Sequence, residues 1–253
     1  MIDIHSHIIY GVDDGARTKE MTLEMLKLSE ESGVKKIVAT PHYMKGRFQI
    51  EYNEIKEIVN EIRQMAKEEN LNIEIYYGQE VYYTENIFKY YMEGEIGTIN
   101  NSRYMLIELP MREFDVNKVI DGLYELTLRG IKPIVAHPER YIPFIKDPSL
   151  INAFIKEGYL FQLNADSVIG EFGKSVKKLA LLYLENGVYD VIGSDAHSIK
   201  NRNTDMRKPI EEVLYKYRND FYKNGQNILE NEIVEKEEKL IKARRKFFDI
   251  FKF

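Results

Sequence analysis

The feature of this sequence that most constrains its fold is a repeated alternation of two kinds of segment. A short run rich in β-branched and other apolar residues is followed by a longer stretch with apolar residues at helical spacing. Seven runs of the first kind predict strands, at residues 2–5, 36–40, 72–77, 104–109, 132–136, 160–164 and 190–193. Strands of this kind that alternate with helices indicate an α/β fold in which helices cover a parallel sheet.

Amphipathic helices are predicted between these strands, at residues 18–32, 51–69, 116–129, 150–157 and 176–186. Most of them are followed directly by glycine, which is typical of a helix end. Seven strand–helix units favour a distorted (β/α)7 TIM-like barrel over a two-domain nucleotide-binding arrangement. We expect a single domain over residues 1–253. Residues 205–253 are predicted to be a mostly helical C-terminal extension, with a long charged helix from about Asn227.

Composition narrows the classes of function. The chain has no cysteine, which excludes disulfides, thiolate metal sites and a cysteine nucleophile. With 36 Lys+Arg against 41 Asp+Glu, the formal charge of −5 disfavours binding to nucleic acid. No apolar run approaches the roughly 18 residues of a membrane-spanning helix, and the first residues lack the pattern of a signal peptide. We therefore expect a soluble cytoplasmic protein without stable membrane insertion.

Ligand-type side chains recur at the ends of the predicted strands. All five histidines lie at or just after such an end, and two glutamates occupy the same kind of place. In barrels of parallel strands, the C-terminal ends of the strands face one mouth, and that mouth carries the chemistry. We therefore expect seven side chains to meet there: His5, His7, His42, Glu80, Glu108, His137 and His197.

The spacing of two residue pairs points to a metal site. His5 and His7 stand two residues apart, as do Asp195 and His197, so on an extended backbone each pair points to one face. Imidazole and carboxylate ligands without thiolate suit Mn, Fe, Zn or Mg. A lone histidine at a strand end is more often a hydrogen-bonded loop residue, but the shared placement of all five favours metal binding.

Four acidic residues near these positions differ in how clearly they indicate a ligand. Glu108 is the clearest case, because a carboxylate inside an apolar strand is costly unless it is paired or metal-bound. Asp13 and Asp14 also fit an ordinary turn. Asp3 faces the same way as His5 and is a candidate hydrogen-bond partner of the ligands.

Several short motifs follow one another along the chain in a specific order: His5-Ser6-His7, Asp13-Asp14-Gly15, Ala39-Thr40-Pro41-His42, Gly78-Gln79-Glu80, Asn100-Asn101-Ser102-Arg103-Tyr104, Ile107-Glu108, Ala136-His137-Pro138-Glu139-Arg140-Tyr141 and Ser194-Asp195-Ala196-His197. In this order they resemble the polymerase-and-histidinol-phosphatase (PHP) superfamily. Within it the chain is most similar to the CpsB/YwqE-type (CpsB/CapC) family, the manganese-dependent protein-tyrosine phosphatases of bacterial capsule and exopolysaccharide operons. The similarity extends to about Met206.

The resemblance implies a PHP-type barrel with a centre of three divalent metal ions, Mn²⁺ ahead of Fe, Zn or Mg. By matching positions, one ion would be held by His5, His7, Glu80 and Asp195, a second by Glu80, Glu108 and His137, and the third by Asp14, His42 and His197. Arg140 and Arg202 match arginines that receive the phosphate, although residues 201–206 differ from the Gly-Arg-Pro-Pro form of close relatives. His197 or Asp14 would assist the leaving group.

The implied activity is hydrolysis of phosphotyrosine by a metal-bridging hydroxide, on the tail of a bacterial tyrosine kinase that controls polysaccharide synthesis. A small-molecule phosphatase such as a histidinol phosphatase remains an alternative, as does a metal-binding regulatory scaffold without turnover. An amidohydrolase fits less well, because that class often has a lysine where this chain has Glu108. The basic residues 239–253 suit a plain helix, or contact with a membrane surface, a partner or a second copy in a homo-oligomer.

Overall fold

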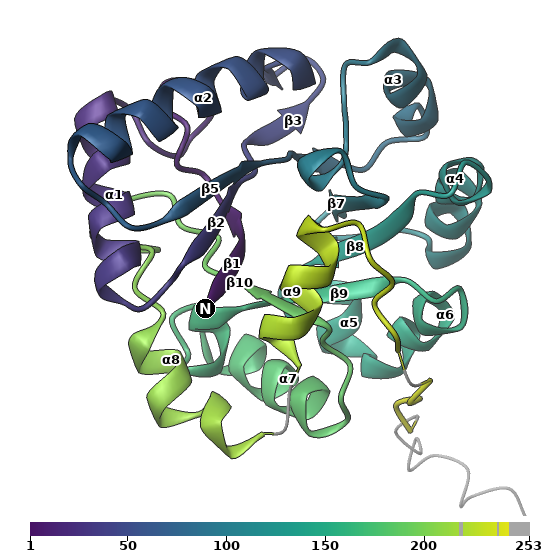
Figure 1. Cartoon of the computed structure of the whole chain (residues 1–253). Coiled ribbons are helices and arrows are strands. Elements are labelled where there is room, and N and C mark those ends of the chain that lie inside the picture. Colours follow the sequence, from purple (N-terminus) through teal and green to yellow (C-terminus); the bar gives the residue numbers. More distant parts are fainter. Residues whose placement is uncertain (218–219, 237, 243–253) are drawn as a thin grey trace, which may run out of the picture.

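Parallel strands form the inner wall of the protein and helices its outer layer in the computed structural model, which describes residues 1–217, 220–236 and 238–242 (Figure 1). The strands are β1 (Ile2–Ser6), β2 (Lys36–Ala39), β3 (His42–Met44), β4 (Phe48–Gln49), β5 (Glu74–Tyr77), β6 (Glu80–Tyr82), β7 (Tyr104–Glu108), β8 (Lys132–Ala136), β9 (Leu160–Asn164) and β10 (Val191–Gly193). The α-helices are α1 (Lys19–Glu31), α2 (Tyr52–Glu68), α3 (Ile87–Glu93), α4 (Val116–Leu128), α5 (Ile142–Lys146), α6 (Ile151–Lys156), α7 (Lys174–Glu185), α8 (Arg207–Glu212) and α9 (Phe221–Leu229). Short 3₁₀ turns are η1 (Ile99–Asn101), η2 (Pro138–Arg140), η3 (Pro148–Leu150), η4 (Ala165–Val168) and η5 (Leu214–Lys216).

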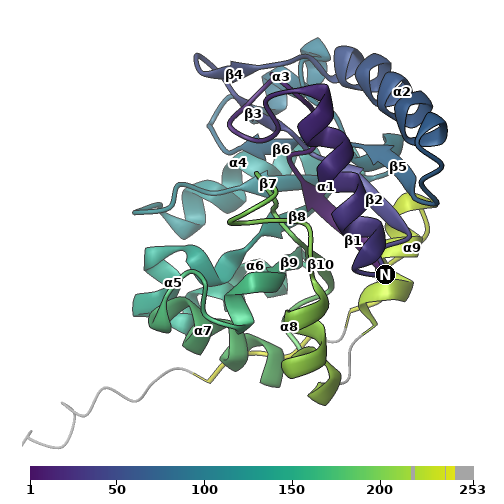
Figure 2. The ribbon, with the colours of Figure 1, turned by 90° about the vertical axis from the view of Figure 1, so that its left-hand side faces the viewer.

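Apart from β4, the described strands occupy seven positions around the barrel, here called staves, and two of these positions are each made of two successive strands. Strand β3 continues β2 after a two-residue break, and β6 continues β5 in the same way (Figure 2). Parallel pairing joins β1, β2 and β5 in one sheet, and joins β10, β9, β8, β7, β6 and β3 in a second, with β4 antiparallel to β3. Backbone hydrogen bonds from Asp195 N to His5 O (2.8 Å) and from His7 N to Ala196 O (2.9 Å) connect the segment after β10 back to β1.

This arrangement confirms the predicted α/β barrel of seven units, with all seven predicted strands in place. The short strands β3, β4 and β6 were not predicted. Pro41 interrupts the second stave because it has no N–H to donate to a ladder. Among the described residues β5 and β7 do not pair, and η1 contacts both of them at this opening.

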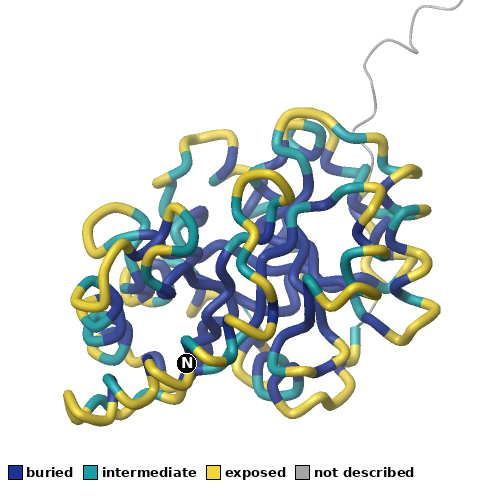
Figure 3. Tube along the Cα trace, turned by 90° about the horizontal axis from the view of Figure 1, so that it is seen from above, coloured by how far each residue is buried: buried dark blue, intermediate teal, exposed yellow. Residues whose placement is uncertain are grey.

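Alternation along the strands divides the apolar side chains into two layers. The outer layer lies between strands and helices, where Ile55, Val59 and Ile62 of α2 are buried at helical spacing. The inner layer fills the barrel and comprises Ile2, Ile4, Val38, Ile99, Tyr104, Leu106, Ile134, Ala136, Leu160, Val191, Ile228, Leu229 and Val234. In Figure 3 the buried strands occupy the centre, with exposed loops and helices around them.

Helix α9 covers the end of the barrel at which the strands begin (Figure 1). Its residues Ile228 and Leu229 belong to the inner layer. Gly225 permits this close approach, because a Cβ there would lie 3.2 Å from the side chain of Ile2. The apolar residues thus fill the half of the barrel nearest α9, and the inward positions at the opposite end carry polar side chains.

The predicted helices are confirmed to within about two residues as α1, α2, α4, α6 and α7. Two of them begin at side-chain caps: Thr18 Oγ1 accepts a hydrogen bond from Met21 N, and Asp115 accepts two from the first turn of α4. Helices α3, α5, α8 and α9 were not predicted individually. None of the helices in the described part of the chain is both long and apolar enough to cross a membrane.

The predicted long charged helix from about Asn227 is wrong over the described residues. Helix α9 ends at Leu229, and Asn231 adopts the left-handed conformation (φ 59°) that ends a helix. Arg103 then donates hydrogen bonds to Asn231, and Tyr104 Oη donates to Glu232 O and accepts from Val234 N. These contacts satisfy the backbone in an extended path under the barrel, in place of helical hydrogen bonds. The remainder of that prediction, residues 243–253, lies outside the described residues.

Candidate metal centre

A cavity of about 470 Å³ opens at the C-terminal ends of the strands. Seven of the nine predicted ligands line it, together with both predicted phosphate-binding arginines: Asp14, His42, Glu80, Glu108, His137, Asp195, His197, Arg140 and Arg202. The other two, His5 and His7, are buried and contact Glu80 and Asp195. Residues from six staves and one loop therefore meet in one place.

The two histidines of the first motif share one group of ligand atoms with Glu80 and Asp195. The Nε2 atoms of His5 and His7 lie 3.1 Å apart, and both lie 3.3 Å from Glu80 Oε2. Asp195 Oδ1 lies 3.6 Å from His5 Nε2 and 3.4 Å from His7 Nε2. A register shift between Asp3 and Ser6 of β1 accompanies this arrangement, as bulges commonly do beside active sites.

Glu80 occupies the middle of the cluster. Its Oε2 atom lies 2.9 Å from His42 Nδ1, and its Oε1 atom lies 2.9 Å from His137 Nε2. Glu108 lies farther away, 3.9 Å from His42 and 4.0 Å from His137. His42, Glu80 and Glu108 form a second group able to hold a cation, and His137 borders it.

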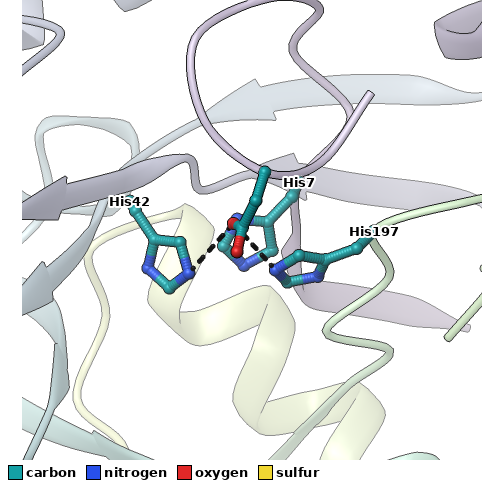
Figure 4. Close-up of side chains that lie close together, drawn as sticks. His7, His42 and His197 are labelled. Atoms are coloured by element: carbon teal, nitrogen blue, oxygen red, sulfur yellow. Dashed lines mark ion pairs between the residues drawn. The ribbon is translucent and has the colours of Figure 1, made fainter. Parts of the chain in front are cut away.

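A third group lies nearer the solvent and includes His7, Asp14, His42 and His197. Asp14 Oδ1 lies 3.6 Å from His42 Nε2 and 3.4 Å from His197 Nε2. Figure 4 shows the three imidazoles converging from separate elements. His7 and His42 each belong to two of the groups, whereas the family resemblance assigned each of them to one and gave the second site to Glu80, Glu108 and His137.

The donor set fits divalent cations. Two nitrogen ligands at about 2.1 Å from one ion and at right angles lie about 3.0 Å apart, close to the separation of the His5 and His7 Nε2 atoms. Burial and Glu80 raise the pKa of Glu108, and burial lowers the pKa of His137 and of His197, each to about 4. Against the effect of burial, the carboxylate of Glu80 raises the pKa of His5 and that of Asp13 raises the pKa of His7. The protein thus gathers carboxylates around imidazoles, an arrangement that a bound cation would stabilise with the imidazoles neutral.

Three positions at the cavity have a positive φ without being glycine: His137 (31°), Asp195 (52°) and Arg202 (50°). Such conformations cost about 1–3 kcal/mol each and concentrate at functional sites. Each of these residues faces the cavity, so the backbone there is set by the position of the side chain.

Further polar residues hold the candidate ligands in place. Asp13 Oδ2 lies 2.7 Å from His7 Nδ1 and also accepts a hydrogen bond from His42 N. Gln162 Oε1 lies 2.9 Å from His5 Nδ1, and Asn164 Nδ2 donates to Asp195 Oδ2 at 2.8 Å. These contacts direct the Nε2 atoms of His5 and His7 toward the carboxylate oxygens of Glu80 and Asp195.

The roles of Gln162 and Asn164 were not predicted from the sequence. Both lie on the inward face of β9 with Leu160. Two amide side chains on the buried face of an apolar strand are the feature of the sequence that could have indicated their role. Asp3 accepts hydrogen bonds from the backbone N–H groups of His5 and Ser194. It therefore holds the backbone next to the candidate ligands and does not contact an imidazole ring through these bonds.

The two arginines lie beside the cluster and contact one carboxylate. Arg140 Nη1 lies 2.5 Å from Asp195 Oδ2, and Arg202 Nη2 lies 2.6 Å from Asp195 Oδ1. The guanidinium of Arg140 also rests 4.7 Å from the ring centre of Phe172. Arg202 Nε is buried and has no hydrogen-bond partner among the described residues. Both arginines line the cavity, with donors near any anion bound there.

Comparison with known proteins places this chain in a family. A family model described as "Capsular polysaccharide synthesis, CpsB/CapC" matches residues 1–231. The chain belongs to the CpsB/CapC family. Among the similar proteins of this family is the tyrosine-protein phosphatase CpsB of Streptococcus pneumoniae, 36% identical over 222 residues that cover 86% of this chain and 91% of the relative.

Solved structures agree with this family assignment. A crystal structure from a study of Bacillus subtilis YwqE and Streptococcus pneumoniae CpsB, described as unique metal-dependent tyrosine phosphatases, has a TM-score of 0.90. It is 27% identical and covers 96% of this chain and all of its own. Histidinol phosphate phosphatase of Lactococcus lactis, with a TM-score of 0.53 and 13% identity over 86% of this chain and 94% of its own, shares the fold alone.

Proposed function

We propose that this CpsB/CapC family member is a metal-dependent protein-tyrosine phosphatase. The observation that carries the proposal is the set of nine imidazole and carboxylate side chains at one barrel mouth, with two arginines beside them. The names of the relatives, tyrosine-protein phosphatases, support the same activity. The absence of cysteine excludes a phosphocysteine route.

We further propose three divalent cations, with Mn²⁺ as the native metal. His5, His7, Glu80 and Asp195 would hold one, Glu80, Glu108 and His137 a second, and Asp14, His42 and His197 the third. Bound cations neutralise the phosphate oxygens and lower the pKa of a coordinated water, which supplies the nucleophile. The three ligand-atom groups among the described residues support three sites, with His7 and His42 each able to contribute to two of them. His137 borders the second group through its contact with Glu80.

The chain's own residues would position the substrate. Arg140 and Arg202 offer planar donor forks for the phosphate oxygens, and Arg202 Nε has a free N–H for this purpose in the described part of the structure. A tyrosine phenol has a pKa of about 10, so it leaves with little protonation. His197 and Asp14, the proton donors that the family resemblance implies, contact each other at the outer edge of the cluster. Burial lowers the pKa of His197 and the hydrogen bond with His197 lowers the pKa of Asp14, so the phenolate would leave with little help from either group.

The physiological substrate would be a phosphotyrosine in the tail of a tyrosine kinase that controls capsule or exopolysaccharide synthesis in the cytoplasm. The family description, capsular polysaccharide synthesis, supports the link to capsule synthesis.

The decisive experiment is hydrolysis of a phosphotyrosyl peptide by chelator-treated protein reconstituted with one cation at a time. We expect turnover with Mn²⁺, and little turnover with histidinol phosphate or a phosphoseryl peptide. Glu80→Gln should lower kcat by several orders of magnitude while the fold stays intact. A metal-loaded wild-type protein that releases no phosphate from any of these compounds would identify a non-catalytic metal-binding protein instead.

A further inference from the structure

Beyond the histidine–carboxylate cluster, the cavity has an outer wall that the proposed chemistry does not use. Its apolar part consists of Met44, Phe48, Tyr82, Pro110 and Met111. Its charged part consists of Arg47, Arg112 and Glu113, and all three are exposed. This outer wall extends from the turn between β3 and β4, across β6, to the loop after β7. A substrate that reaches the cations must pass it.

The β3–β4 turn is held firmly against the cluster. Met44 pairs with Phe48 across the two strands, and Gly46 provides the positive φ (86°) that the turn requires. The ring of Phe48 stacks on the imidazole of His42, with centroids 5.6 Å apart and planes 11° apart. The guanidinium of Arg47 lies 4.7 Å from the centre of the Phe48 ring. The position of Arg47 is therefore coupled to a candidate metal ligand through one aromatic ring.

The two arginines of the outer wall differ from the two at the cluster in having no anionic partner. Arg140 Nη1 and Arg202 Nη2 each form an ion pair with Asp195. In the described part of the chain, neither Arg47 nor Arg112 takes part in an ion pair. Glu113 is the one acidic residue that lines the described cavity outside the cluster. The outer wall is therefore electropositive and its guanidinium groups are available to a ligand.

The order of the strands sets the approximate distance between the guanidinium groups of Arg47 and Arg112. The order β7, β6, β3 across the sheet puts one strand, β6, between β7, which precedes the loop with Arg112, and β3, which precedes the turn with Arg47. Two strand spacings amount to about 10 Å, and an extended peptide advances about 3.3 Å per residue. An extended substrate centred on Tyr82 of β6 would thus meet the two arginines with residues about three positions apart.

We propose, on the basis of the phosphotyrosine phosphatase activity proposed above, that Arg47 and Arg112 recognise anionic side chains next to the phosphotyrosine of the substrate. The apolar part of the outer wall contacts the phenyl ring, and each arginine binds a flanking carboxylate or second phosphate. Guanidinium forks match both kinds of anion. Each exposed ion pair favours the substrate about twofold to fivefold, so two favour an acidic over a neutral sequence about fourfold to twenty-fivefold at low salt.

The test compares phosphotyrosyl peptides with matched flanks: glutamate, glutamine, lysine, or a second phosphotyrosine. For each protein, kcat/KM on each peptide is divided by kcat/KM on p-nitrophenyl phosphate, which has no flanking residues. The proteins are wild type, Arg47→Gln/Arg112→Gln, Glu113→Gln and the control Arg129→Gln. Arg129 is exposed and precedes β8 at the opposite end of the barrel, which makes it a matched arginine without access to the cavity. Affinity is measured separately with peptides that carry a non-hydrolysable phosphonate analogue of phosphotyrosine.

We expect wild type and Arg129→Gln to share the preference for anionic flanks, Glu113→Gln to increase it, and the double variant to lower it to about one. Comparison of the glutamate and second-phosphotyrosine peptides identifies which anion is read. Equal normalised rates for glutamate and glutamine peptides in wild type, or a preference retained by the double variant, would overturn the inference. If metal-loaded wild type hydrolyses nothing, the proposed function fails. The phosphonate affinities then decide this inference alone, by the same comparison of flanks and variants.

Discussion

Asp13→Asn is the change that most sharply tests how the candidate ligands are held. The carboxylate of Asp13 is buried and lies 2.7 Å from His7 Nδ1. Burial opposes ionisation, but His7 lowers the pKa of Asp13 below its usual value, so the carboxylate accepts the Nδ1–H of His7. This hydrogen bond fixes the His7 ring with Nε2 facing the carboxylates of Glu80 and Asp195, where its lone pair would bind a shared cation. Asparagine keeps the shape of the side chain and removes its charge.

A charge-assisted hydrogen bond contributes about 1.5–3 kcal/mol, which corresponds to about a tenfold to hundredfold change in an equilibrium constant. We expect Asp13→Asn to weaken Mn²⁺ binding by that factor, measured by competition with a chromophoric chelator in stripped protein. Asp115→Asn is the matched control, because Asp115 caps α4 away from the cavity and asparagine caps equally well. Mn²⁺ affinity within twofold of wild type in a folded Asp13→Asn protein would refute the role assigned to Asp13.

Three further predictions concern packing, metal binding and pH. Gly15→Ala places a Cβ 2.3 Å from His7 O, so we expect the protein to be destabilised by about 1–3 kcal/mol and to bind Mn²⁺ more weakly. Chemical denaturation measures the first effect and chelator competition the second. Wild-type values in both measurements would contradict this prediction. Mn²⁺ at about 100 times its Kd stabilises the protein by about 2.7 kcal/mol, so the Tm of wild type should rise by several degrees in a thermal melt. An equal rise in Tm for Glu80→Gln would exclude Glu80 as a ligand. Burial and the nearby Glu171 raise the pKa of Asp166 to about 6; the folded state therefore keeps this proton longer than the unfolded state, and stability falls as pH rises from about 4 to 6. Asp166→Asn should then add about 1–2 kcal/mol at pH 7, after allowance for partial exposure, and nothing at pH 3.5, and equal denaturation midpoints for variant and wild type at pH 7 would contradict the sign.

The strands that could be predicted from the sequence are those whose apolar runs are long enough to show a pattern. Tyr104–Glu108 and Leu160–Asn164 fill the barrel with every second residue, and that signal is local. Strands β3 and β6 have three residues each and are stabilised by neighbouring staves, so their own sequence carries little signal. The error after Asn227 has a similar cause: the helical pattern there is overridden by hydrogen bonds with Arg103 and Tyr104, more than 120 residues earlier.

The candidate site was more predictable than the strands around it, because packing alone rarely puts an imidazole or a carboxylate at the end of nearly every strand. His42, His137 and His197 come from distant parts of the chain and lie at one mouth, as their placement indicated. The residues that hold the ligands were harder to find. Asp13 looks like an ordinary turn residue, and its contact with His7 depends on how the loop folds back on the barrel. The spacing of residues along the chain does not predict that the loop folds back and brings Asp13 to His7.

Nine side chains are proposed above to bind divalent cations at the C-terminal mouth of the barrel: His5, His7, Asp14, His42, Glu80, Glu108, His137, Asp195 and His197. Anomalous diffraction from crystals grown with Mn²⁺ tests this claim most directly. We predict anomalous peaks within about 2.5 Å of Glu80 carboxylate oxygens and of the Nε2 atoms of His5 and His7, with a further peak between Asp14 and His197. A map from Mn²⁺-saturated crystals with no anomalous peak in this cavity would contradict the claim.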